Sequence, residues 1–179
     1  VDLGGREIRK YAWYVRATQD QADKSVENIA AMLESPEIAK YYPGLSDRLI
    51  GKYGNSKGWR RSRLRASNGF TVDAIGLDTA ARGAKVEEQR PDLMVFDDID
   101  EALDSPAMTG KKSTIIRTSL LPAGDKQNCA IIAIQNLIIP DGIFSQLADG
   151  RADFLSDRIV SGPHPAIENL TYEQRALVV

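Results

Sequence analysis

The sequence contains very little of the two residue types that most often build metal and nucleophilic sites. Among its 179 residues there is one cysteine, Cys129, and one histidine, His164. A single cysteine excludes an intrachain disulfide and a cysteine-built zinc site. His164 lies in a Gly-Pro-His-Pro segment, and the flanking prolines favour a loop. We therefore expect no histidine-based metal centre or catalytic triad within this chain.

The sequence also lacks a charged-then-apolar signal segment and any apolar run of membrane-spanning length. Its composition, 42% hydrophobic and 27% charged, is typical of a globular domain, and its length is sufficient for one domain with a substantial core. The chain begins with Val1 rather than methionine. We therefore expect a soluble piece of a longer protein, with no membrane partner.

A third absence concerns phosphate binding. No G-x-x-x-x-G-K-[ST] motif occurs, so no phosphate-cradling loop and no cofactor-binding residue can be assigned. The nearest match, Gly110-Lys111-Lys112-Ser113-Thr114, has Ser105 where the first glycine belongs and lies inside an expected helix. We interpret this lysine-rich stretch as a solvated helix face.

The most informative feature that is present is the run LMVFDDIDE, residues 93–101. Four apolar residues between polar flanks predict a strand covered on both faces by helices, and two adjacent carboxylates, Asp97 and Asp98, follow it. Open α/β sheets bind ligands at the carboxyl ends of their strands. In P-loop ATPases the first acid at such an end holds the magnesium shell and the second polarises the attacking water. Alternatively, the acids only cap the next helix.

Strand and helix patterns alternate along the rest of the chain. YAWYVRA (residues 11–17) and CAIIAI (129–134) predict strands, while Thr18 and Gln21 form a capping box that opens a helix. Ser105 before Pro106 caps another helix, and residues 143–148 predict a short one. This alternation predicts an α/β fold with a mainly parallel sheet flanked by helices. We place this core in residues 1–160 and a tail or linker in residues 161–179.

Charge is unevenly distributed, although the net charge is only −2. Residues 48–72 contain seven Lys or Arg and no acid, whereas residues 87–104 contain eight acids and one base. Within the basic stretch, alternation on both sides of Ser67-Asn68-Gly69 predicts an inserted β-hairpin. One face of this hairpin would carry a row of arginines, which we expect to contact DNA phosphates: Arg60, Arg61, Arg63 and Arg65. The alternative is that these charges protect a solvent-facing edge strand.

Three blocks resemble the ATPase domain of the large terminase subunit of tailed bacteriophages, the motor that packages DNA into proheads: residues 17–29, 79–101 and 132–163. The resemblance implies a P-loop ATPase of the additional-strand, conserved-glutamate type, here an incomplete fragment without the Walker A segment. It gives Asp97 the magnesium role of the Walker B motif. Asp98 falls where the family usually has its catalytic glutamate, and the shorter side chain leaves open whether Asp98 or the following Asp100-Glu101 reaches the water.

The same resemblance assigns three further residues. Gln135 and Asn136 fall at the coupling motif, which senses the γ-phosphate; the alternative is that these amides cap the following turn. Arg82, followed by Gly83, is the candidate for an arginine finger inserted into a neighbouring subunit's ATP site. The alternative for Arg82 is a plain surface arginine.

From these observations we expect a fragment of a viral motor that couples ATP hydrolysis, with Mg²⁺, to translocation of double-stranded DNA. The fragment alone would be inactive as an ATPase. Expected partners are the portal, the small terminase subunit and further copies in a ring, in the host bacterial cytoplasm at the prohead. Two alternatives stay open. One is a metal-dependent nuclease or phosphohydrolase that uses Asp97, Asp98, Asp100 and Glu101; the other is a non-catalytic DNA-binding module.

Overall fold

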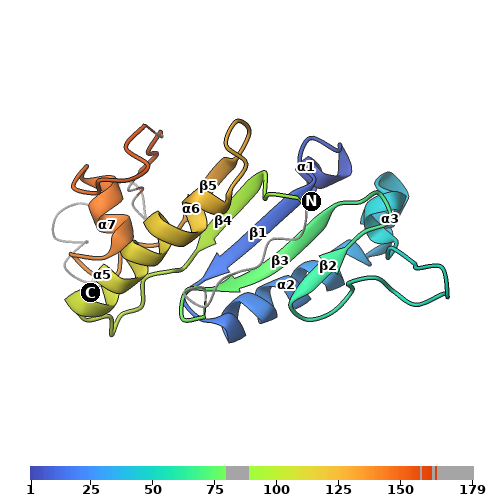
Figure 1. The fold of residues 1–179 in the computed structure, drawn as a ribbon, viewed down its shortest axis with the longest axis horizontal. Coiled ribbons are helices and arrows are strands. Elements are labelled where there is room, and N and C mark those ends of the chain that lie inside the picture. Colours follow the sequence, from blue (N-terminus) through green and yellow to red (C-terminus); the bar gives the residue numbers. More distant parts are fainter. Residues whose placement is uncertain (80–88, 158, 163, 165–179) are drawn as a thin grey trace, which may run out of the picture.

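The computed structural model describes residues 1–79, 89–157, 159–162 and 164. Its centre is a five-stranded sheet with the strand order β2-β3-β1-β4-β5. Strands β1, β3, β4 and β5 run parallel to one another, and β2 is antiparallel to β3. The expected α/β fold with a mainly parallel sheet is therefore confirmed (Figure 1). The strands are β1 (Tyr11–Arg16), β2 (Arg63–Arg65), β3 (Thr71–Gly76), β4 (Leu93–Asp97) and β5 (Ala130–Ile134).

Helices cover both faces of the sheet. Helix α2 packs on β1 and β3, and a second, continuous helical segment made of α5, η2 and α6 lies over the other face with α7. The middle part of that segment, η2, has π-helical geometry. The helices are α1 (Asp2–Gly5), α2 (Gln19–Leu33), α3 (Pro36–Tyr41), α4 (Pro43–Ser46), α5 (Pro106–Ile115), η2 (Ile116–Leu120), α6 (Leu121–Ala123) and α7 (Ile143–Ala148). Among the described residues, no helix combines the length and apolar character needed to cross a bilayer.

The two central strands contribute side chains to both cores, because successive residues of a strand point to opposite faces. In β1, Trp13 and Val15 belong to the core beneath α5 and η2, whereas Ala12 belongs to the core beneath α2. In β4, Met94 and Phe96 face the first core, and Leu93 faces the second. Burial on both faces explains why the apolar run in β4 is continuous rather than alternating.

Helix α2 begins where the sequence predicts. The Thr18 hydroxyl accepts from the backbone N–H of Gln21, and the Gln21 side chain accepts from the backbone N–H of Thr18, so both halves of the capping box are present. The helix then buries Ala22, Val26 and Leu33 against the sheet. Each fully buried Val or Leu side chain contributes roughly 1.5–3 kcal/mol relative to an exposed one.

The expected β-hairpin is confirmed, but it is not a separate insertion, because its second strand, β3, also pairs with β1 inside the sheet. Strands β2 and β3 pair around the Ser67-Asn68-Gly69 turn, with Arg63 opposite Asp73 and Arg65 opposite Thr71. Gly69 has a φ of 88°, a conformation that glycine adopts without the steric cost of a side chain. Strand β2 therefore forms the edge of the sheet opposite β5 (Figure 1).

Strand β5 forms the opposite edge of the sheet. It is apolar along its whole length, yet Ile132 and Ile134 are 41% and 59% exposed, and Leu137 and Ile138 after the strand are exposed as well. Among the described residues no strand pairs with its outer edge. Edge strands are normally short, charged or covered. The composition of β5 is instead that of an internal strand of a parallel sheet.

Candidate active site at the ends of β1 and β4

The strand order creates a switch point between β1 and β4. From β1 the chain proceeds to β3 on one side, and from β4 it proceeds to β5 on the other. The connecting helices α2 and α5 lie on opposite faces of the sheet. A crevice outside the carboxyl ends of two such strands is the usual ligand position in open α/β sheets. The last residues of these strands are Arg16 and Asp97.

Asp97 is held by two side chains from β1. Arg16 Nη1 donates to Asp97 Oδ2 at 2.6 Å, and the Tyr14 hydroxyl donates to the same oxygen at 2.8 Å. Burial, followed by the hydrogen bond to Asp97, raises the pKa of Tyr14 to about 12, so the phenol remains protonated as a donor. Both bonds use Oδ2, and no residue of the described chain bonds to Oδ1. Asp97 is thus oriented, and within the described ranges its Oδ1 is left for another ligand.

Asp98 differs from Asp97 in exposure and conformation. Its side chain is 56% exposed, and Arg16 Nη2 lies 3.3 Å from its Oδ2. Its backbone has a φ of 44°, which is uncommon for a residue other than glycine, and its N–H donates to the carbonyl of Ile134 at the end of β5. Asp98 thus lies just past the end of β4. Strained backbone of this kind often occurs at functional sites.

Asp100 has a structural role. Its two carboxylate oxygens accept from the backbone N–H groups of Ile143 and Phe144, each at 2.9 Å, and so cap the first turn of α7. Gly142 makes this possible, because a Cβ there would lie 2.7 Å from Asp100 Oδ2. The sequence alone did not predict this cap, since the partners are more than forty residues apart.

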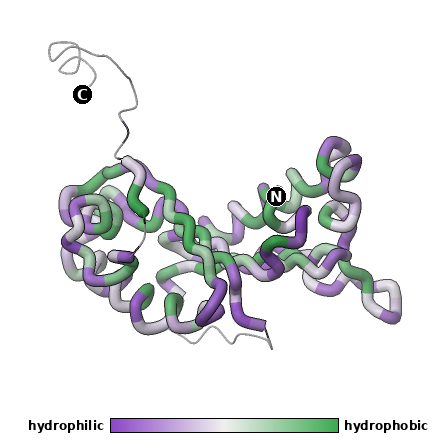
Figure 2. The backbone as a smooth tube through the Cα atoms, turned by 90° about the horizontal axis from the view of Figure 1, so that it is seen from above, coloured by the Kyte–Doolittle hydropathy of each residue, from purple (hydrophilic) through white to green (hydrophobic). Residues whose placement is uncertain are grey.

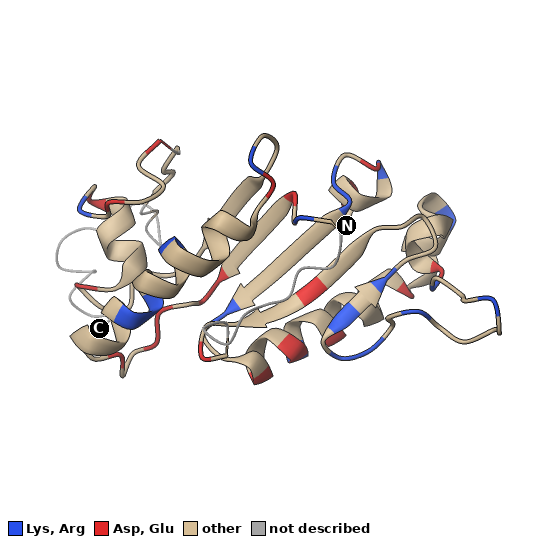
Figure 3. Cartoon of the chain, in the orientation of Figure 1, with Lys and Arg blue, Asp and Glu red and all other residues tan. Residues whose placement is uncertain are grey.

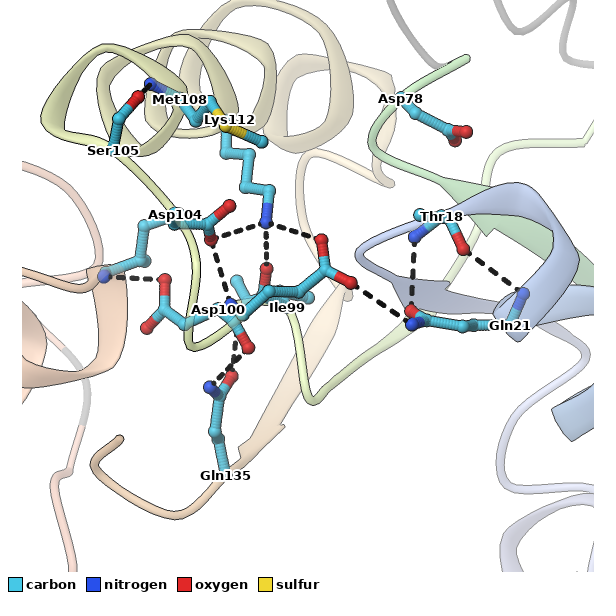
Figure 4. A network of polar contacts seen from close by, with 12 residues as sticks. Thr18, Gln21, Asp78, Ile99, Asp100, Asp104, Ser105, Met108, Lys112 and Gln135 are labelled. Carbon is cyan, nitrogen blue, oxygen red and sulfur yellow. Dashed lines mark hydrogen bonds and ion pairs between the residues drawn. The ribbon is translucent and has the colours of Figure 1, made fainter. Parts of the chain in front are cut away.

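Gln135 binds the main chain of Asp100 through both ends of its amide. Its Oε1 accepts from the N–H of Asp100 at 2.9 Å, and its Nε2 donates to the carbonyl of Asp100 at 3.0 Å. The side chain therefore couples the end of β5 to the loop that follows Asp97 and Asp98 (Figure 4). Asn136 is exposed and lines a concave region of about 670 Å³ together with Ile134, Leu137 and Phe144. Both predicted amides line this region, and of the two Gln135 is the one that bonds to Asp100.

Glu101 belongs to a third group of polar contacts, centred on Lys112 (Figure 4). Lys112 Nζ donates to the carbonyl of Ile99 at 2.9 Å and to Asp104 Oδ2 at 2.6 Å, and it lies 3.6 Å from Glu101 Oε2. Gln21 Nε2 donates to the other oxygen of Glu101 at 3.2 Å, which links this loop to α2. Glu101 is therefore already engaged on both oxygens.

The interpretation of the lysine-rich stretch as a solvated helix face is wrong for Lys112. The stretch is helical, as expected, but Lys112 is only 7% exposed and its partner Asp104 has a fully buried side chain. Lys111 beside it is exposed. Burial of the ammonium group is possible because three oxygens surround it.

The arginine row does not form an open face of positive charge. Arg63 forms a two-pronged ion pair with Asp73, which also accepts from the Tyr11 hydroxyl at 2.5 Å. Burial, followed by the bond to Asp73, raises the pKa of Tyr11 to about 12. Arg61 lies 2.8 Å from Asp20 on α2. These two arginines are thus neutralised within the fold, contrary to the expected exposed row; Arg65 is partly buried and Arg60 is exposed.

Two further expectations concern residues that lie mostly or wholly outside the described ranges. Arg82 lies outside the described residues, as does most of the tail assigned to residues 161–179. Sequence reasoning also missed Tyr14 and Arg16, the two residues that hold Asp97. Their position at the end of a strand was a usable signal, because neighbouring parallel strands bring their carboxyl ends together.

The described residues contain no group of three or more His, Cys, Asp or Glu arranged to hold a metal ion. The four acids of residues 97–101 are instead divided among Arg16, the start of α7 and Lys112. Comparison with models of protein families and with curated protein sequences finds no match to this chain.

Proposed function

We propose that this chain is part of a P-loop ATPase of the DNA-packaging type, with its catalytic acids at the end of β4, beside the end of β1. The observation that carries the proposal is the position of Asp97 and Asp98 at the switch point of a parallel sheet, next to a strand whose first following residue is Gln135. The resemblance of residues 79–101 to terminase large subunits supports the same assignment.

In this proposal Asp97 is the magnesium-side acid. Mg²⁺ in ATPases is typically bound by one or two carboxylates, with water and substrate phosphates completing six ligands. A single oriented carboxylate fits that requirement, and the absence of a three-acid cluster among the described residues is compatible with it. Arg16 balances the charge of Asp97 and Asp98, with which it pairs at 2.6 and 3.3 Å. When bound, the metal would neutralise charge developing on the phosphates.

Asp98 is the better candidate for the water-orienting acid. Its side chain is exposed, whereas Glu101 is occupied by Lys112 and Gln21. Gln135 would transmit the state of the site, because it bonds to the same loop that carries both acids. Arg82 remains the proposed arginine finger, and Asn136 remains part of the proposed coupling motif.

The outer edge of β5 supports the presence of a further strand beside it in the complete protein. An apolar strand with an unpaired outer edge and exposed isoleucines is the arrangement expected of a parallel sheet that continues. We propose that a strand outside these 179 residues pairs there and supplies the phosphate loop that the sequence lacks. The 179-residue chain by itself should then bind ATP weakly, which calorimetry can test.

The nuclease alternative receives less support. Two ions in such enzymes lie about 3.5–4 Å apart and share several carboxylates. Here Asp100 caps α7 and Glu101 pairs with Lys112, so neither points into a common site with Asp97. Double-stranded DNA, the portal, the small terminase subunit and a homo-oligomeric ring are the partners that the packaging proposal entails.

The test uses the full-length gene product that contains these 179 residues. We expect about fifty preceding residues to contain a strand and a glycine-rich loop ending in Lys-Ser or Lys-Thr. In that protein, Asp98→Asn should abolish ATP hydrolysis while Mg-ATP binding is retained, and Glu101→Gln should retain most of the turnover. Loss of turnover in Glu101→Gln but not in Asp98→Asn would assign the water-orienting role to Glu101. The absence of hydrolysis in the unmodified protein would refute the proposal.

A further inference from the structure

A projecting loop, residues 49–60, leads into β2 at the end of the sheet farthest from β5. In both views it extends well beyond the sheet (Figures 1 and 2). Its base is fixed by backbone bonds: the N–H of Leu49 donates to Arg65 at 2.9 Å, and the N–H of Lys57 donates to Leu49 at 2.7 Å. Ile50 and Ser56 form an antiparallel bridge. We call this segment the basic loop.

The charges of the basic loop and of the strand beside it are not equally available. Of the seven bases between residues 48 and 65, three pair with acids of the fold: Arg48 with Glu34, Arg61 with Asp20, and Arg63 with Asp73. The other four have no acidic partner among the described residues: Lys52, Lys57, Arg60 and Arg65. Three of these, on the basic loop itself, are exposed: Lys52, Lys57 and Arg60. Blue segments mark this end of the sheet in Figure 3.

The tip of the loop carries an aromatic side chain in solvent. Tyr53 is 85% exposed, and it precedes Gly54, whose φ of 77° forms the turn. The turn is closed by the N–H of Gly51 donating to Asn55 at 2.8 Å and by the N–H of Gly54 donating to Gly51 at 3.0 Å. Tyr53 is thus presented on a backbone that is already ordered, which lowers the entropy lost on binding.

We propose that the basic loop is a binding element for duplex nucleic acid. Lys52, Lys57 and Arg60 would contact backbone phosphates, and Tyr53 would lie against the sugars and bases between them. Unpaired cations fit this partner because neutralising phosphates releases condensed counterions. The protein as a whole carries a net charge of −2, so the attraction is local to this loop. The choice of duplex DNA as the partner rests on the proposed packaging function, whereas the place of contact follows from the loop's charge and geometry. Because the binding test below needs no ATP hydrolysis, the two proposals can fail separately.

The test compares two triple variants of the 179-residue chain. Lys52→Gln, Lys57→Gln and Arg60→Gln together remove the three loop cations; Lys10→Gln, Lys111→Gln and Lys126→Gln together remove three other exposed cations. Binding to a labelled DNA duplex is followed by fluorescence anisotropy across a salt series. Affinity falls as salt rises, so the slope of log affinity against log salt is negative. In the loop variant this slope should become less steep by about 2.7, at 0.9 per lost phosphate contact, whereas in the control variant it should be nearly unchanged.

Tyr53 supplies a second readout. Tyr53→Ala should weaken duplex binding without altering the salt slope, and Tyr53→Phe should restore it, because a ring and not a charge is being replaced. No salt-dependent binding by the unmodified chain, or an equal loss in both triple variants, would overturn the proposal. Binding of phosphatidylserine vesicles that exceeds duplex binding and is lost in the loop variant would replace nucleic acid by a membrane surface as the partner. Since all six cations are exposed, circular dichroism should show both triple variants folded.

Discussion

Arg16 and Asp97, the last residues of two neighbouring strands, face each other with Nη1 and Oδ2 2.6 Å apart. The guanidinium also reaches Asp98, at 3.3 Å. One cation from β1 therefore neutralises both acids that end β4. Because both partners in the first pair are about one-fifth exposed, solvent screens the interaction only in part.

This pair predicts a measurable coupling. Arg16→Gln and Asp97→Asn should each destabilise the fold, and the double variant should lose less than the sum of the two. We expect a coupling free energy of about 1 kcal/mol from urea unfolding of the four proteins. The exposed pair Arg6 and Asp2 is the matched control, for which the coupling should be smaller. Strict additivity for Arg16 and Asp97 would contradict the observed geometry.

Two tyrosines with raised pKa values, one buried and one partly buried, predict a loss of stability at high pH. Tyr11 and Tyr14 have folded pKa values of about 12, above the ordinary value of 10.0. A pKa raised by folding means that the protonated form is favoured in the folded state, so the contribution is complete below pH 10 and is lost as pH rises from there through about 12. Denaturant unfolding across this range should show the decline, and Tyr14→Phe should make it shallower. Tyr41→Phe, at an exposed position, should not change it.

Gly76, at the end of β3, predicts a severe packing defect. A Cβ there would lie 2.1 Å from the backbone nitrogen of Gln19 at the start of α2. Gly76→Ala should therefore destabilise the protein by about 2 kcal/mol or more, because backbone atoms must shift. Gly110→Ala is the control: nothing lies within 4 Å of its Cβ position in α5, and alanine should stabilise that helix by about 1 kcal/mol. Thermal unfolding that moves in the same direction for both would refute this packing.

Lys112 predicts a contrast between two adjacent lysines. Lys112→Met should cost about 3 kcal/mol, because it leaves the buried carboxylate of Asp104 without its cation. Lys111→Met, on the exposed side of α5, should change the free energy of unfolding by less than about 0.5 kcal/mol. Equal effects in urea unfolding would support the original interpretation of this stretch as solvated.

The sequence predicted those parts of the fold that are set by local pattern. The apolar run in β4, the capping box at Thr18 and the turn at Asn68-Gly69 each depend on residues within a few positions, and each is confirmed. The contacts of Lys112 and Asp100 were missed because their partners are brought together by the path of loops that carry no periodic signal. The pair Arg63 and Asp73 could have been found, since the turn places these residues opposite each other in the hairpin.

In the candidate site, too, features set by local sequence could be predicted, whereas contacts between distant segments could not. Asp97 and Asp98 could be located from one strand alone, whereas their partners Tyr14 and Arg16 required the strand order. The separation of Asp100 and Glu101 from Asp97 likewise depends on where α7 and α5 pack. Adjacent acids in a sequence do not share a site when each is held by a different element.

The most direct test of the proposed function is steady-state ATP hydrolysis by the longest chain encoded around these residues, compared with its Asp97→Asn variant. The control is Asp47→Asn, an exposed acid whose carbonyl bonds to Ser67 in the hairpin turn and not to the ends of β1 and β4. The account predicts magnesium-dependent hydrolysis that is abolished in Asp97→Asn and unchanged in Asp47→Asn, with circular dichroism showing all three proteins folded. A turnover in Asp97→Asn equal to that of the unmodified protein would contradict the assignment of this strand end as the catalytic site.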